Sequence, residues 1–163
     1  MLKNNETALK KLDWVKSKND KILTLVYDLE NETPLQSQDL VQCLTLFDKA
    51  GAFKRTIKIF LVITKVDRLQ EYTDNKDSYE EIKKAVENRI RTEQPALINT
   101  IESIIEKNQV SKWYSVGHKI ELEILPMSIS TSLVKSKFIK DQDPRFIEEY
   151  AKKMEKGLLI RKM

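Results

Sequence analysis

The chain has 163 residues, of which 40% are hydrophobic and 33% are charged. This balance is typical of a soluble globular domain and excludes the disordered class, and the length suits a single domain over residues 1–163. The net charge is +4, from 29 basic and 25 acidic residues. Because the two signs are interspersed, we expect a solvated surface rather than a nucleic-acid-binding face.

The one cysteine, Cys43, excludes an internal disulfide and fits a reducing compartment. We expect it to be a small core residue. No apolar run approaches the roughly 20 residues that a membrane span needs, and the N-terminal residues lack the apolar core of a signal peptide. His118 has no second histidine or cysteine pattern near it, so no metal site is predicted. We therefore expect a cytoplasmic protein without a membrane contact.

The first half of the chain alternates between helical and strand patterns. Residues 7–17 have near-helical apolar spacing, and 21–29, "KILTLVYDL", form a dense apolar run that predicts a buried strand. Pro34 opens a helix over 35–50, and Gly51 marks its end. From residue 57 a second apolar run, "IKIFLVI", predicts a buried strand that ends at Thr64.

The second half continues the same alternation. Residues 70–81 are polar and rich in turn formers, and 78–108 have a helical period that Pro95 should break near residues 92–94. Residues 120–130 predict a third strand that ends in a loop rich in Ser and Thr. Asp143 and Pro144 then open a last helix that runs to about Met154.

This order of elements predicts an α/β fold. Strands that alternate with helices pair in parallel through right-handed crossovers. The expected architecture has three layers, with a small, mainly parallel three-stranded sheet flanked by helices.

The carboxyl ends of the strands are where open parallel sheets bind ligands. Asp67, after the second strand, can accept two hydrogen bonds at once, from the ring N–H and the exocyclic amine that guanine offers together. Lys65 lies two residues earlier and can lay its stem over the base while its ammonium stays in water. Thr64 can tie this loop to its neighbours. The small residues at 128–131, after the third strand, let backbone N–H groups reach the base carbonyl.

These segments resemble the P-loop GTPases. "FLVITKVDRL" is similar to their guanine-specificity motif, with Thr64, Lys65 and Asp67 in the motif positions, and "ILPMSIS" is similar to their later Ser-Ala loop, with Ser128 in the Ser position. Ile129 departs from the usual Ala. The resemblance covers about residues 1–157, matches the C-terminal half of the domain, and is nearest to TRAFAC-like GTPases. It implies a partial P-loop NTPase fold and binding of GTP or GDP through Thr64, Lys65, Asp67 and Ser128.

The phosphate-binding half of that family's site has no counterpart in this sequence. The motif G-x-x-x-x-G-K-S/T is absent, since glycine occurs only at 51, 117 and 157, and the Asp-x-x-Gly element is absent too. No catalytic residue and no metal ligand are therefore predicted. We expect no hydrolysis by this chain alone, GTPase activity only if an N-terminal half completes it, and an affinity for guanosine on the order of millimolar.

A second hypothesis is a protein–protein interaction or scaffold domain in which the nucleotide motif is a relic or a coincidence. The strand at 21–29 would lie at a sheet edge with unpaired N–H and C=O groups, and such an edge invites another strand. Its partner would be another chain or a second copy in a homo-oligomer.

Overall fold

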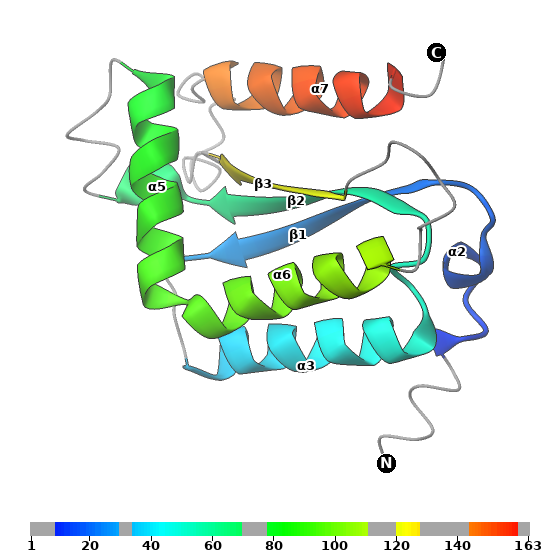
Figure 1. The fold of residues 1–163 in the computed structure, drawn as a ribbon. Coiled ribbons are helices and arrows are strands. Elements are labelled where there is room, and N and C mark those ends of the chain that lie inside the picture. The colour runs from blue at the N-terminus through cyan, green and yellow to red at the C-terminus, as the bar shows by residue number, and fades with distance from the viewer. Residues whose placement is uncertain (1–8, 30–33, 70–77, 111–119, 128–143, 160–163) are drawn as a thin grey trace, which may run out of the picture. The chain divides into compact units, whose positions relative to one another are not determined.

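The structure, a computed structural model, describes residues 9–29, 34–69, 78–110, 120–127 and 144–159. Strands and helices alternate along this part of the chain, which confirms the predicted α/β fold class (Figure 1). The elements are α2 (Asp13–Lys16), β1 (Lys21–Asp28), α3 (Pro34–Ala50), β2 (Thr56–Thr64), the 3-10 helix η1 (Val66–Arg68), α5 (Tyr79–Glu93), α6 (Pro95–Val110), β3 (Glu121–Pro126) and α7 (Pro144–Leu159).

The three strands form one parallel sheet in the order β1-β2-β3. Near the start of β1 and β2, the Lys21 N–H donates to the carbonyl of Arg55, and at their ends the Thr64 hydroxyl donates to the carbonyl of Tyr27. The two strands therefore run in the same direction (Figure 1). In the described sheet β2 is the central strand, and most of its side chains are buried, as expected for an apolar run with a strand on each side.

Strand β1 is less buried than its sequence predicts. Tyr27 is its one buried side chain, and Val26 is 62% exposed. The prediction of a buried strand over 21–29 was therefore wrong for most of β1. The reason is its place at the edge of the sheet, because an edge strand has a neighbour on one side only.

The chain divides into two compact units, and each strand begins in the first and ends in the second. The first unit holds α2, α3 and α6, and α3 packs along α6. Helix α3 ends as predicted at Gly51, whose φ of 80° is left-handed. The N–H groups of Gly51 and Ala52 donate to the carbonyls of Asp48 and Phe47, which is the Schellman arrangement of hydrogen bonds.

Two further expectations for this unit were wrong. The helix predicted over 7–17 is interrupted in the described residues: Leu9 is helical, residues 10–12 are not, and α2 covers Asp13–Lys16. Leu12, directly before α2, has an extended backbone. Cys43 is exposed on α3 and is not a core residue. The buried apolar residues of the unit are Val15, Leu44, Ala50, Ala52, Phe53, Ile59, Leu97, Ile98, Ile101, Ile104, Ile105 and Ile120.

The second unit holds the strand ends, η1, α5 and α7. Helix α7 packs on the strands through Tyr150, whose ring lies 5.7 Å from that of Phe60 and whose hydroxyl is 3.1 Å from the Thr24 hydroxyl. The predicted break between α5 and α6 is confirmed at Gln94, directly before Pro95. The buried apolar residues of the unit are Tyr27, Leu29, Phe60, Leu61, Val62, Ile63, Val66, Leu69, Ile82, Val86, Ile90, Ile124, Leu125 and Phe146.

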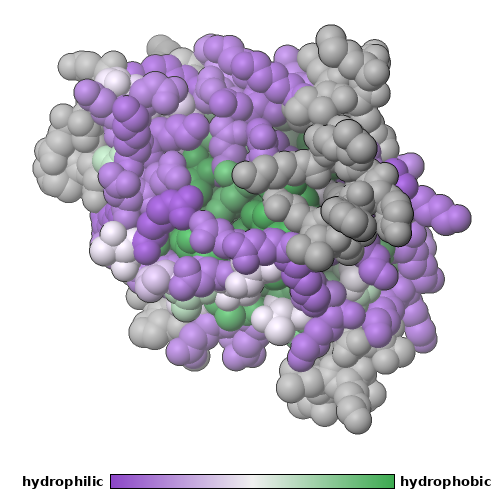
Figure 2. Space-filling model, in the orientation of Figure 1, coloured by the Kyte–Doolittle hydropathy of each residue, from purple (hydrophilic) through white to green (hydrophobic). Residues whose placement is uncertain are grey.

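The surface is mostly hydrophilic in the view of Figure 2, with a smaller hydrophobic area between the polar side chains. The large apolar side chains that are exposed in the described residues are Leu12, Trp14, Val26 and Ile147. Over the same residues, the helices lack the combination of length and apolar character that a bilayer span requires.

Candidate functional site

The carboxyl ends of β2 and β3 are joined by two backbone hydrogen bonds. The N–H of Met127 donates to the carbonyl of Ile63 at 2.7 Å, and the N–H of Val66 donates to the carbonyl of Met127 at 3.3 Å. The second bond lies beyond the end of β2, so it fixes the turn after β2 against the segment after β3. In the sequence, Asp67 directly follows Val66, and Ser128 directly follows Met127.

Thr64 is the last residue of β2, and its side chain is buried. Its hydroxyl donates to the carbonyl of Tyr27 in β1 at 3.3 Å. The hydroxyl therefore has a hydrogen-bond partner despite its burial, as buried polar groups normally do. This contact links the turn after β2 to the end of β1.

Lys65 has a left-handed backbone, with φ 59° and ψ 30°. A residue with a Cβ pays roughly 1–2 kcal/mol in this region, so it is held there by its surroundings. Its Nζ lies 2.6 Å from Oδ2 of Asp28, the last residue of β1, and the two side chains are 27% and 17% exposed. The sequence analysis expected this ammonium in water, but in the structure it is paired with a carboxylate.

The turn itself is closed by its own backbone and anchored by apolar side chains. The N–H groups of Arg68 and Leu69 each donate at 3.0 Å, to the carbonyls of Lys65 and Val66 respectively. The side chains of Val66 and Leu69 are buried. Together with the contacts to Tyr27, Asp28 and Met127, these interactions hold residues 64–69 in one conformation.

The four predicted site residues are described to different degrees. Thr64 and Lys65 lie together at the end of β2, with the contacts given above. The backbone of Asp67 lies in η1, while its side chain and the whole of Ser128 lie outside the described parts of the chain. The roles predicted for these four residues stay predictions.

Asp28 is the residue of this end that sequence reasoning missed. It lies within the strand predicted over 21–29, but no chemistry was assigned to it. The signal that could have found it is an opposite charge at the carboxyl end of the neighbouring parallel strand, since such ends meet at one edge of the sheet.

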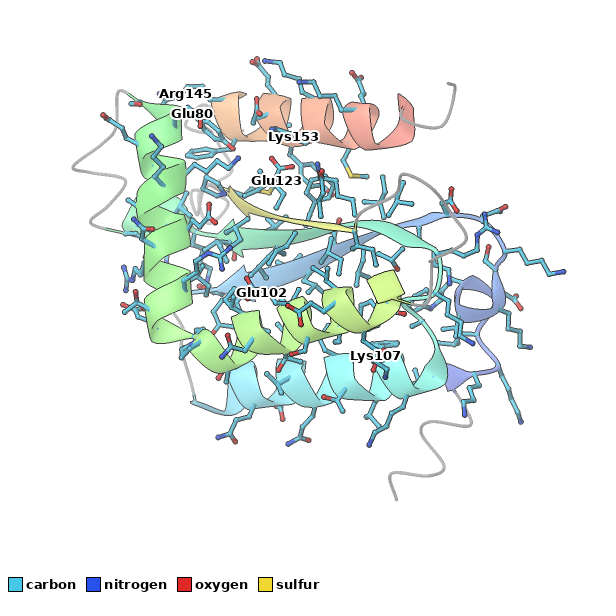
Figure 3. The ribbon with its side chains drawn as sticks, viewed as in Figure 1. Glu80, Glu102, Lys107, Glu123, Arg145 and Lys153 are labelled. Atoms are coloured by element: carbon cyan, nitrogen blue, oxygen red, sulfur yellow. The ribbon has the colours of Figure 1, made fainter. Side chains whose placement is uncertain are left out.

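A second polar cluster lies in the same unit. Glu123 of β3 accepts from Lys83 of α5 and from Lys153 of α7, at 3.3 Å and 2.9 Å (Figure 3). The hydrogen bond to Glu123 raises the pKa of Lys153. Nearby, the Tyr79 hydroxyl is buried without a hydrogen-bond partner among the described residues, and burial raises its pKa. The three charged side chains pair across β3, α5 and α7, and the Tyr79 ring lies 5.5 Å from that of Phe146 in α7, so this cluster joins these elements.

The first unit has an open groove of about 320 Å³ between α3 and α6, and its lining includes Thr45, Thr100, Asp48 and Lys107. The two threonine hydroxyls donate to carbonyls one turn earlier on their own helices. Lys107 Nζ lies 2.6 Å from Asp48 Oδ2. These groups are therefore paired within the protein, as Thr64 and Lys65 are at the strand ends.

Within the described residues, the structure contains no group of three or more His, Cys, Asp or Glu side chains placed to hold a metal ion. Comparisons with protein-family models, with curated proteins and with solved structures find no match. The support for the candidate site is therefore its geometry alone: the turn after the central strand β2 is strained at Lys65 and anchored by hydrogen bonds and buried side chains.

Proposed function

We propose that the turn after β2 and the segment after β3 form a recognition site for the base of a guanine nucleotide, GTP or GDP. The observation that carries this proposal is the hydrogen bond from the Val66 N–H to the Met127 carbonyl. It supports a shared pocket, because it holds the backbone next to Asp67 close to the backbone next to Ser128.

Each residue has a distinct role in this proposal. Asp67 accepts from the ring N–H and the exocyclic amine of guanine, and Ser128 belongs to the loop that faces the base carbonyl. Lys65 covers the face of the base with its stem, and Thr64 supports the turn through Tyr27. The left-handed backbone of Lys65 supports a functional turn, since strained residues cluster where a fixed shape is needed.

The proposed activity is binding and not hydrolysis. The sequence has no phosphate-binding motif, so this chain supplies contacts to the base only. We expect a dissociation constant on the order of 1 mM. Hydrolysis would require a phosphate-binding half in addition to these 163 residues. The proposed location is the cytoplasm, where guanine nucleotides occur at high concentration.

A titration followed by amide chemical shifts tests the proposal. GDP, ADP and IDP are added to the full chain, and the amides of Lys65, Val66 and Arg68 are followed. We expect saturable shifts with GDP, weaker binding of IDP because hypoxanthine lacks the exocyclic amine, and little change with ADP. In Asp67→Ala the preference for GDP should disappear. Asp39→Ala, which removes an exposed carboxylate of α3, should leave it intact.

Equal responses to GDP and ADP in the native chain would reject the proposal. The result would be decisive if it persisted after a polypeptide carrying the phosphate-binding half was added.

A second candidate function is an interaction module that adds a strand at β1. The observation that favours it is the 62% exposure of Val26 on an edge strand, since soluble proteins rarely leave an apolar edge strand accessible. The partner would be another chain or a second copy, paired through the backbone of β1.

Light scattering after size-exclusion chromatography tests this second candidate. We expect a concentration-dependent oligomer in the native chain and a monomer in Val26→Lys. Ile147→Lys, at a comparably exposed apolar residue of α7, is the matched control and should not change the mass. A native chain that stays monomeric at all concentrations would exclude self-association through β1.

A further inference from the structure

Both ends of β2 are flanked by a non-glycine residue with a left-handed backbone, Arg55 before it and Lys65 after it. Each side chain is paired with an aspartate at the matching end of β1. Arg55 Nη2 lies 2.8 Å from Asp20, and Lys65 Nζ lies 2.6 Å from Asp28. The pair at the amino end is the more exposed one, with Arg55 51% exposed, while at the carboxyl end both partners are largely covered.

We propose that Asp28 determines the ligand class of the turn at residues 64–69: it neutralises the Lys65 ammonium, so that the turn accepts the uncharged face of a nucleobase and rejects a phosphate group. The part that concerns the base rests on the function proposed above. The part that concerns phosphate rests on the Asp28–Lys65 pair alone.

Without Asp28, the Lys65 ammonium would lose its carboxylate partner. A lysine without a carboxylate partner attracts phosphate, because an ammonium and a phosphate form a short, charge-assisted hydrogen bond. At 2.6 Å, the Asp28 carboxylate already takes one of the three N–H donors of the ammonium and offsets its charge. A phosphate on the remaining donors would lie beside this carboxylate and be repelled by it, and displacing the carboxylate would break a partly buried ion pair, which is unfavourable.

The pair also changes what the rest of Lys65 can do. A lysine stem in solution samples many rotamers, and fixing it on a ligand is entropically unfavourable. With both ends of the side chain held, at the backbone by the turn and at Nζ by Asp28, the stem is ordered before a ligand arrives. A flat, uncharged ring gains most from such a surface, since it contacts the stem and not the charge.

The experiment uses two probes, guanosine and inorganic pyrophosphate, added separately to the full chain. Binding is read from the amide shifts of Lys65, Val66 and Leu69. The native chain should respond to guanosine and not to pyrophosphate. Asp28→Asn should acquire pyrophosphate binding at least about fivefold tighter than any in the native chain, and this binding should weaken as salt is raised.

Three further variants separate this role from a loss of structure. The double variant Asp28→Asn/Lys65→Met lacks the ammonium and should therefore not bind pyrophosphate. If Asp28→Asn bound pyrophosphate only because its turn was disordered, the double variant would still bind it. Lys65→Met keeps an unbranched stem but loses the hold of Asp28 on its end, so it should bind guanosine about two- to fivefold more weakly than the native chain. Asp20→Asn breaks the equivalent pair at the other end of β1 and should acquire no pyrophosphate binding at these amides. Arg68 is retained in every chain, so its charge does not affect the comparison.

The outcomes distinguish the two proposals. Saturable pyrophosphate binding by the native chain would overturn the role of Asp28 even if Asp28→Asn failed to fold. Unchanged pyrophosphate binding in a folded Asp28→Asn would do the same. A Lys65→Met chain that bound guanosine as tightly as the native chain would overturn the ordering of the stem by Asp28. A native chain that binds neither probe would reject the base site, whereas the response of Asp28→Asn to pyrophosphate would still decide the role of Asp28.

Discussion

The carboxylate of Glu123 and the ammonium of Lys153 lie 2.9 Å apart, which ties helix α7 to strand β3 (Figure 3). The same carboxylate oxygen lies 3.3 Å from the ammonium of Lys83 in α5. One acidic side chain therefore holds two helices that are more than 50 residues apart in the sequence.

Replacing Glu123 by Gln should destabilise the protein by about 1–3 kcal/mol, because two partly buried ammonium groups lose their charged acceptor. Glu123 is 14% exposed, whereas Glu121 on the same strand is 63% exposed and lies 3.7 Å from Lys58. Glu121→Gln is therefore the control and should change stability by less than about 0.5 kcal/mol. Urea unfolding of both variants measures the difference. Equal effects would show that Glu123 does not hold the helices.

Tyr79→Phe should leave stability at pH 7 unchanged or raise it by up to about 1 kcal/mol. The Tyr79 hydroxyl is buried without a partner among the described residues, so its removal relieves a desolvation penalty. Tyr150→Phe is the contrasting variant. It removes a hydroxyl that contacts Thr24 and should lower stability by about 0.5–1 kcal/mol. A clear loss of stability in Tyr79→Phe would mean that the hydroxyl has a partner after all.

The stability of the native chain should also fall above pH 10. Burial, with the carboxylates of Glu149, Glu80 and Glu123, raises the pKa of Tyr79 above its ordinary value of 10.0. Above that pH the unfolded chain loses this proton while the folded chain keeps it, so unfolding becomes more favourable. Lys153 acts in the same direction. Its raised pKa stabilises the fold below pH 10.5, and this contribution is lost at higher pH.

Lys21 acts in the opposite direction. Burial and the charge of Arg55 lower its pKa, so its unfavourable contribution disappears as the pH approaches 10.5. Lys153 and Lys21 contribute equally to the unfolding free energies of Tyr79→Phe and the native chain, so their contributions cancel in the difference between the two. This difference in unfolding free energy should therefore increase between pH 10 and pH 11.5. A constant difference over that range would exclude the proposed environment of Tyr79.

Lys65→Gly should be more stable than Lys65→Ala by about 1 kcal/mol. Both variants lose the ion pair to Asp28, but only glycine adopts the left-handed backbone without strain. Gly51→Ala reverses the comparison at a position with φ 80° and should lose a similar amount. Thermal unfolding of the three variants measures these values. If Lys65→Ala were as stable as Lys65→Gly, the backbone at residue 65 would not be strained.

Replacing a valine by alanine should cost more stability in the central strand β2 than in the edge strand β1. Val62 of β2 is 2% exposed, and Val62→Ala should cost about 2 kcal/mol in lost burial and cavity formation. Val26 of β1 is largely exposed, and Val26→Ala should change stability by less than about 0.5 kcal/mol. A large loss in Val26→Ala at low protein concentration would mean that β1 is covered in solution.

The fold class was predictable because periodicity and breakers agreed along the chain. The apolar run before Thr64 and the stop at Gly51 are local signals, and the structure bears them out. The exposure of β1 was not predictable from its composition, since an apolar run looks the same in a central and an edge strand. That difference depends on which strands lie beside it.

The candidate site was predictable only in part. Thr64 and Lys65 were found from their place at the end of an apolar strand. Asp28 was not, because its partner lies 37 residues away and no short motif links the two. The left-handed backbone at Lys65 also has no sequence signal, since it is imposed on a residue that does not favour it.

The paired aspartates constrain how this chain can change in evolution. Asp20 precedes β1 and Asp28 ends it, while Arg55 and Lys65 flank β2 in the same way. A one-residue deletion in either strand shifts everything beyond it by about 3.3 Å and inverts the alternation of its side chains. At least one of the two aspartates would then lose its basic partner. Insertions and deletions in these strands should therefore be tolerated only when β1 and β2 change by the same number of residues.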